Sequence, residues 1–127
     1  MAESHDVVVL GVGGMGSAVA YQLAKRGLSV VGIEKNSIGH DRGSSHGLTR
    51  IIRLAYFEHP AYVPLLRRAF ALWRELEAES GQELLHVTGA IDAGVPGSRV
   101  FEGSLEACRV HGLTHEVLSA EDRKSVV

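Results

Sequence analysis

Residues 11–16 read Gly11-Val12-Gly13-Gly14-Met15-Gly16, and this G-x-G-x-x-G stretch decides the fold. An apolar run without proline, Asp6 to Leu10, precedes it and is typical of a buried parallel strand. A helical pattern follows from Ser17 to Arg26, with Gly27 as its stop. A second strand is predicted from Leu28 to Ile33. The motif therefore lies at the turn of a predicted β-α-β unit.

The glycines and the acid that follows them suit a dinucleotide. Gly11 permits a tight turn, Gly13 removes a side chain where a pyrophosphate approaches, and Gly16 allows close helix–strand packing. The free N–H groups of the helix then face the phosphates. Glu34, at the end of the second strand, can accept hydrogen bonds from ribose hydroxyls. The alternative is a β-turn-α unit without a ligand, and the motif alone does not separate NAD from FAD.

The composition argues against a nucleic-acid-binding, membrane or secreted protein. The 127 residues are 45% hydrophobic and 22% charged, with a net charge of −2 and interspersed signs, which disfavours nucleic-acid and membrane partners. No positively charged leader and no apolar run of spanning length is present, so neither a signal peptide nor a transmembrane segment is predicted. A single cysteine, Cys108, forms no internal disulfide and suits the reducing cytoplasm.

The predicted fold looks incomplete. A doubly wound nucleotide-binding domain needs several β-α-β units to cover both faces of its sheet, and only one is evident here. Residues 122–127, Asp-Arg-Lys-Ser-Val-Val, are what a common sequencing-library adapter encodes. We therefore expect a non-native tail after about Glu121 on the opening part of a larger protein; the alternative is a natural protein that ends this way by chance.

The connection after Glu34 is long and rich in glycine, serine and histidine, which is typical of functional or disordered loops. It leads into the apolar run Thr49 to Leu54, which holds Arg50 and Arg53 three residues apart. On one side of a helical turn, both guanidinium groups could face a single anionic ligand. The alternative is a basic pair on the surface.

Four more elements are predicted. Residues 61–80 follow the period of an amphipathic helix, residues 84–95 look extended, residues 99–111 form another helix, and residues 113–118 a short strand. Core packing is expected for a stripe on the first of these helices and for part of the second: Tyr62, Leu65, Leu66, Ala69, Phe70, Trp73, Leu76, Val100, Leu105 and Cys108.

The stretch from Gly43 to Tyr56, Gly-Ser-Ser-His-Gly-Leu-Thr-Arg-Ile-Ile-Arg-Leu-Ala-Tyr, closely resembles the monomeric sarcosine oxidase and N-methyltryptophan oxidase family of FAD-dependent amino-acid oxidases. The resemblance continues through Tyr62-Val63-Pro64-Leu65 and Thr88-Gly89, and is more specific than the glycine motif. It implies an α/β fold: the N-terminal β-α-β of a Rossmann-like FAD-binding domain over residues 1–83, then the start of an α+β substrate domain over residues 84–121.

The resemblance also implies the cofactor and its site. FAD would lie with its ADP half on the glycine turn and Glu34, and its flavin end at the loop from Ser44 to Ile51. His46 and Arg50 match residues beside the flavin ring, and Arg53 matches an arginine that pairs with the substrate carboxylate, so these three are the predicted catalytic residues. The predicted cofactor-binding residues are Gly11, Gly13, Gly14, Met15, Gly16, Glu34, Lys35, Ser44, Ser45, Thr49, Arg50 and Ile51.

The implied reaction is oxidation of the C–N bond of a secondary amino acid such as sarcosine or N-methyltryptophan, imine hydrolysis, and reduction of O2 to H2O2 by a monomeric enzyme. Two departures from the family pattern stand out. Ser45 replaces a second histidine, and the family's oxygen-activating lysine, second carboxylate-binding group and covalent flavin cysteine are absent. Cys108 does not match that cysteine and is expected to be an inert core thiol.

Other interpretations of these residues stay open. His46 could be a solvated loop histidine, and His40 and His59 are expected on the surface. No spacing supports a metal site or a Ser-His-Asp triad. An NAD-dependent dehydrogenase and a non-catalytic nucleotide-binding fragment remain alternative functions. The 127-residue chain by itself is expected to aggregate and to bind FAD weakly, because an incomplete sheet exposes an edge and apolar faces.

Overall fold

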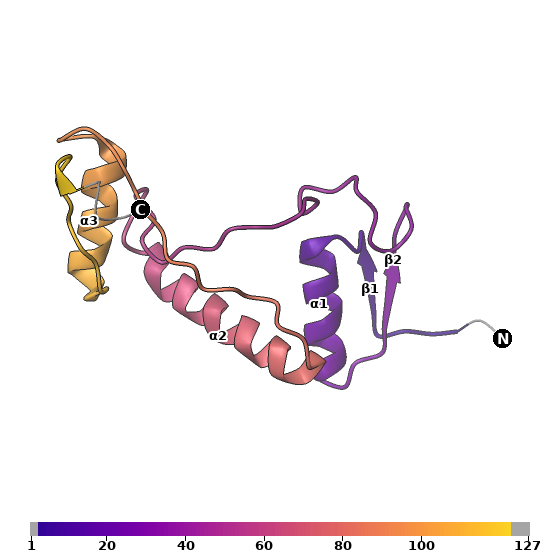
Figure 1. The fold of residues 1–127 in the computed structure, drawn as a ribbon. Coiled ribbons are helices and arrows are strands. Elements are labelled where there is room, and N and C mark those ends of the chain that lie inside the picture. The colour runs from indigo at the N-terminus through magenta and orange to yellow at the C-terminus, as the bar shows by residue number, and fades with distance from the viewer. Residues whose placement is uncertain (1–2, 123–127) are drawn as a thin grey trace. The chain divides into compact units, whose positions relative to one another are not determined.

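The computed structural model describes residues 3–122. The elements follow in the order β1 (Val7–Leu10), α1 (Gly14–Lys25), β2 (Val30–Ile33), α2 (Tyr62–Ser80) and α3 (Arg99–His111) (Figure 1). They form two compact units, Met1–Ile51 and Ile52–Val127. The N-terminal β-α-β confirms the predicted fold class, whereas the boundary between residues 83 and 84 stays a prediction. None of the described helices is both long and apolar enough to cross a bilayer.

In the first unit β1 and β2 pair in parallel, from Val7 opposite Val30 to Leu10 opposite Ile33. The Ser29 N–H donates to the Asp6 carboxylate at 2.8 Å, just before the two strands. Both strands are shorter than predicted, since β1 begins at Val7 and β2 at Val30. Helix α1 begins three residues earlier than predicted because the glycines of the motif form its first turn.

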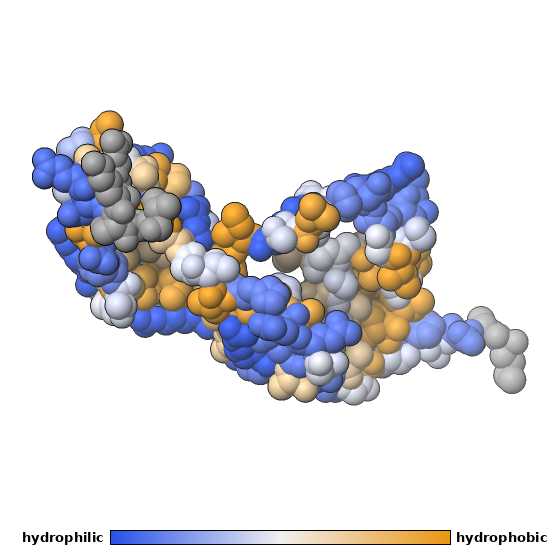
Figure 2. Space-filling view, viewed as in Figure 1, coloured by the Kyte–Doolittle hydropathy of each residue, from blue (hydrophilic) through white to orange (hydrophobic). Residues whose placement is uncertain are grey.

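Helix α1 covers one face of the two strands. The side chain of Val9 is buried there, and only 8% of the residue is exposed. Val8 and Leu10 point to the other face and are 58% and 85% exposed. Figure 2 shows the resulting hydrophobic surface over the β1 and β2 region. Exposed apolar faces of this kind are the reason why aggregation of the isolated chain is predicted, and that outcome stays a prediction.

In the second unit helix α2 begins one residue later than predicted and ends as predicted at Gly81, which takes the left-handed conformation (φ 68°). Val63 is fully buried. The predicted core stripe is wrong in part: Tyr62, Leu65 and Trp73 are 48%, 68% and 40% exposed. Helical periodicity identifies the residues that share a face, but it does not determine how much of that face other segments cover.

Helix α3 has the predicted bounds, and Ser104, Ala107 and Cys108 are its buried residues. The predicted strand over residues 113–118 is wrong, since this segment is irregular, and residues 84–95 form no strand either. A strand needs a neighbour to satisfy its backbone N–H and C=O groups. Within the described part of the second unit no strand is available to pair with them.

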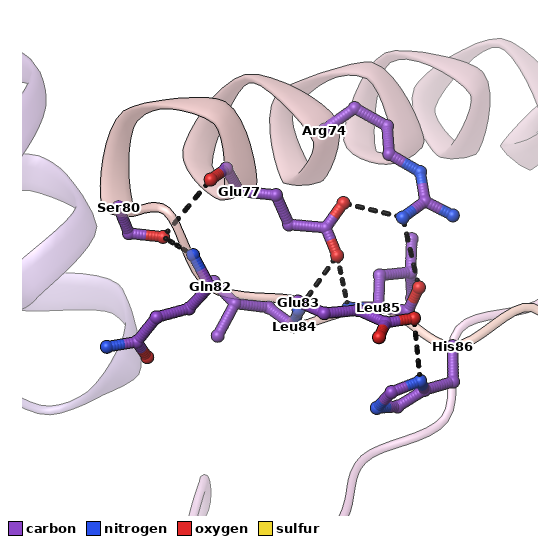
Figure 3. A network of polar contacts seen from close by, with 8 residues as sticks. All are labelled: Arg74, Glu77, Ser80, Gln82, Glu83, Leu84, Leu85 and His86. Atoms are coloured by element: carbon purple, nitrogen blue, oxygen red, sulfur yellow. Dashed lines mark hydrogen bonds and ion pairs between the residues drawn. The ribbon is translucent and has the colours of Figure 1, made fainter.

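A carboxylate fixes the segment that follows α2 (Figure 3). Glu77 Oε1 accepts hydrogen bonds from the backbone N–H groups of Leu84 and Leu85, each at 2.8 Å. Its other oxygen pairs with Arg74, which also donates to the Leu85 carbonyl at 3.1 Å. These donors, led by the Leu85 N–H and the Arg74 side chain, lower the pKa of Glu77 from 4.5 to about 2.

The Glu77→Gln variant is expected to lose protection of the Leu84 and Leu85 amides against hydrogen exchange, because a neutral amide oxygen is the weaker acceptor. In the unmodified chain the depressed pKa predicts protection that is complete above pH 4.5 and is lost as the pH falls toward about 2. Protection factors from amide exchange, measured by NMR, check both the effect of the substitution and the pH dependence in the unmodified chain. Equal factors in the variant and the parent would contradict the assigned role.

Candidate cofactor-binding site

The glycine turn has the geometry that the motif predicts. Gly11 has a φ of 87°, which favours glycine. A Cβ on Gly16 would overlap the Gly11 carbonyl oxygen, so helix and strand approach closely only because no side chain intervenes. A Cβ on Gly13 would meet nothing within 4 Å. The space beside Gly13 is therefore open to a ligand.

Helix α1 has an uncapped N-terminus. Gly13, the N-cap residue, provides no side-chain cap, and the first turn contains no acidic residue. Within residues 3–122 the backbone N–H groups of Gly14, Met15 and Gly16 donate to no acceptor. Free N–H groups together with the helix dipole form a site for an anion such as a phosphate.

Glu34 lies beside this turn. Its carboxylate accepts hydrogen bonds from the N–H of Asn36 at 3.0 Å and from the N–H of Val12 at 2.8 Å. These two bonds, with the nearby His40, hold the pKa of Glu34 below its usual range and keep the group charged. The bond to Val12 joins the end of β2 to the glycine turn, so the two predicted parts of the dinucleotide site are brought together.

His40 is more buried than the sequence predicts. Its imidazole lies 3.5 Å from the Glu34 carboxylate and is only 15% exposed, so the prediction of a surface residue is wrong. The contact with Glu34 explains the burial. His59 is exposed, as predicted.

The loop from Ser44 to Arg50 is closed on itself by Arg50. Its guanidinium donates to the carbonyl of Ser44 at 3.0 Å and to that of Thr49 at 3.1 Å. It also lies against Gly47, whose φ is 147°. Ser45 packs directly against Gly14, where a Cβ would overlap its hydroxyl. The structure thus places part of the loop at the N-terminus of α1, with a fixed positive charge within the loop.

Four other predicted site residues have side chains that make no hydrogen bond or ion pair within residues 3–122. His46, Met15, Lys35 and Ile51 are all exposed. The predicted helical turn around Arg50 and Arg53 is wrong, since the segment is irregular. Two adjacent β-branched residues, Ile51 and Ile52, disfavour a helix. The cofactor roles of the exposed residues stay predictions.

Arg53 belongs to the second unit and has partners that sequence reasoning missed. Its Nη1 donates to Asp92 Oδ1 at 3.0 Å, and its guanidinium carbon lies 5.1 Å from the centre of the Tyr56 ring. Ser104 Oγ donates to the other Asp92 oxygen at 2.7 Å. Asp92 is the sole acidic residue between Leu84 and Val95, a signal that could have singled it out.

Cys108 is buried, as predicted, and burial together with the charge of Asp92 raises the pKa of its thiol. A thiol in this environment is a poor nucleophile. No cluster of three His, Cys, Asp or Glu side chains in the described part of the chain could hold a metal ion.

The family model for FAD dependent oxidoreductases (DAO) matches residues 6–126. The chain belongs to this FAD-dependent oxidoreductase family. The family implies a flavin cofactor, and the glycine turn, the free N-terminus of α1 and the charged Glu34 fit the ADP half of FAD. A pyrophosphate requires bare backbone and N–H donors, and a ribose requires an acceptor. The nicotinamide alternative loses its support, because the family is defined by FAD.

The chain is similar to oxidases of two kinds. The chain is 47% identical over 122 residues to a monomeric sarcosine oxidase of Streptomyces avermitilis, a match that covers 96% of this chain and 32% of the relative. It is 41% identical over 123 residues to a monomeric sarcosine oxidase of Bacillus sp. (strain B-0618), covering 96% and 32%. It is 38% identical over 116 residues to an N-methyl-L-tryptophan oxidase of Yersinia pestis, covering 91% and 31%. The chain spans about a third of the length of these relatives.

Proposed function

We propose that this chain provides the FAD-binding and carboxylate-binding part of an oxidase of secondary, N-methylated amino acids. The observation that carries the proposal is the uncapped N-terminus of α1 beside Glu34, in a chain similar to oxidases of sarcosine and N-methyl-L-tryptophan. The substrate, the use of O2, a monomeric state and a cytoplasmic location are parts of the same proposal.

The predicted site residues divide into those that would bind FAD and those that would bind the substrate. The N–H groups at the start of α1 would bind the pyrophosphate, and Glu34 would bind the ribose hydroxyls and repel a 2′-phosphate. Arg50, fixed by the Ser44 and Thr49 carbonyls, would provide positive charge at the flavin end. Arg53 would bind the substrate carboxylate, and His46 would donate a hydrogen bond near the flavin.

The chemistry that bound FAD supplies is the acceptance of a hydride equivalent from the substrate carbon next to the nitrogen, and the transfer of those two electrons to O2 to give H2O2. The substrate nitrogen loses a proton, and water hydrolyses the imine to an amine and an aldehyde. The residues of this chain bind and orient; they exchange no electrons themselves.

The test uses a chimera in which residues 1–121 are joined to the remaining two thirds of the Streptomyces avermitilis relative. The chimera is expected to purify with bound yellow flavin and to release H2O2 with sarcosine or N-methyl-L-tryptophan, whereas the 127-residue chain alone releases none. Without O2, the same amines should bleach the flavin. A chimera that carries flavin but is not bleached by either amine would contradict the proposed substrate class, and one that carries no flavin would contradict the cofactor site.

A further inference from the structure

Arg53 is held from two sides within the second unit. Asp92 accepts a hydrogen bond from its Nη1 at 3.0 Å, and the Tyr56 ring lies under the guanidinium with 5.1 Å between Cζ and the ring centre. The Arg53 side chain is 33% exposed and that of Asp92 19%. This pair is therefore partly shielded from water, and its geometry is better fixed than that of an exposed ion pair.

Asp92 is itself held by α3. Ser104, which is only 6% exposed, donates its hydroxyl to Asp92 Oδ2 at 2.7 Å. A Cβ on the neighbouring Gly103 would overlap the Phe57 carbonyl oxygen, so α3 packs against the backbone of the segment that follows Arg53. The chain of contacts from Ser104 through Asp92 to Arg53 thus starts on a helix that is closely packed against the same segment.

The contacts leave one edge of Arg53 available. A guanidinium carries five N–H donors in a fixed fork. Asp92 takes a donor on Nη1, and within residues 3–122 the Nε and Nη2 groups donate to no acceptor. Those two groups present parallel N–H bonds, the arrangement that binds a carboxylate through both of its oxygens.

We propose that Asp92, held by Ser104, is a positioning residue that orients Arg53 so that its Nε and Nη2 edge faces the carboxylate of the amino-acid substrate. The proposal rests on the proposed function, since it assigns Arg53 to the substrate carboxylate. Without Asp92 the long arginine side chain would sample other rotamers, and ordering it again on binding would weaken the affinity for the substrate.

The test compares KM and kcat of the chimera for sarcosine and for dimethylamine, which is sarcosine without its carboxylate. Asp92→Ala is expected to raise the KM for sarcosine about tenfold, with kcat, flavin content and the KM for dimethylamine within about twofold of the parent. Asp92→Asn keeps an oxygen that can accept from Arg53, so it should restore most of the affinity. Ser104→Ala removes only the outer contact and should raise the KM for sarcosine by a smaller factor than Asp92→Ala.

Glu75→Ala is the matched control, because it breaks an exposed ion pair with Arg68 on α2 that includes neither Arg53 nor Asp92. It should leave both KM values unchanged. An unchanged KM for sarcosine in Asp92→Ala would overturn the proposal. So would a lowered KM in Asp92→Asn, which would show that Asp92 competes with the substrate for Arg53, or equal losses for both amines, which would indicate a structural role only.

The failure of this proposal can be distinguished from failure of the proposed function. If the parent chimera binds flavin but oxidises neither amine, the proposed function fails. The role of Asp92 is then measured from the flavin absorbance change on titration with acetate as the carboxylate probe. Weaker acetate binding in Asp92→Ala than in the parent would support the positioning role, and equal binding would overturn it.

Discussion

Gly13→Ala in the chimera is expected to weaken FAD binding about 30- to 100-fold while the fold stays intact. A Cβ at this position meets nothing within 4 Å, so the methyl group costs the protein no packing. It occupies the space that a pyrophosphate needs beside the backbone. Overpacking of this kind costs about 2.0–2.7 kcal/mol, which corresponds to this loss of affinity.

Gly16→Ala should behave differently, because its Cβ would overlap the backbone carbonyl of Gly11. The turn itself would have to move, so both FAD binding and helix content should fall. Gly43→Ala is the control: its Cβ would lie 3.6 Å from the nearest atom, His40 Cε1, an ordinary contact. The FAD dissociation constant from fluorescence titration and the far-UV circular dichroism spectrum separate the cases. A parent-like dissociation constant in Gly13→Ala would exclude a pyrophosphate at this turn.

The features that depend on neighbours in the sequence were predictable. The β-α-β unit follows from a short apolar run, three glycines with fixed roles and a helical period, all within the first 34 residues. Helix α3 has the bounds that the sequence predicts, and it ends where Gly112 takes the left-handed conformation. Such signals act over one or two turns of the chain.

The features that depend on distant partners were not predictable. A strand over residues 113–118 requires a neighbouring strand, and its apolar pattern says nothing about whether one is present. The contact between Arg53 and Asp92 joins residues 39 positions apart. In the site, the sequence predicted that Glu34 and the glycine turn bind one dinucleotide, but the bond from the Val12 N–H to Glu34 that joins them emerged only from the structure.

Arg53→Lys is expected to raise the KM of the chimera for sarcosine about 30-fold and to leave the KM for dimethylamine nearly unchanged. Lysine keeps the positive charge but has a compact ammonium group instead of a planar fork. This single group cannot hold Asp92 and also bind both oxygens of the substrate carboxylate. The loss of one charge-assisted hydrogen bond, about 2 kcal/mol, accounts for this factor.

Arg53→Met should raise the KM for sarcosine further, because both the fork and the charge are lost and the partly shielded Asp92 is left unpaired. The double variant Arg53→Met, Asp92→Ala shows how much of this rise in KM comes from the unpaired Asp92. If Arg53 alone binds the carboxylate, removing Asp92 as well should change the KM for sarcosine little further. Arg68→Lys on α2 is the matched control for an arginine in an exposed ion pair, and should change neither constant. If Arg53→Lys changed the two KM values by the same factor, Arg53 would not bind the substrate through its carboxylate. The chain would then need another cation for this role, and Arg50, which already donates to two carbonyls, would be the next to test.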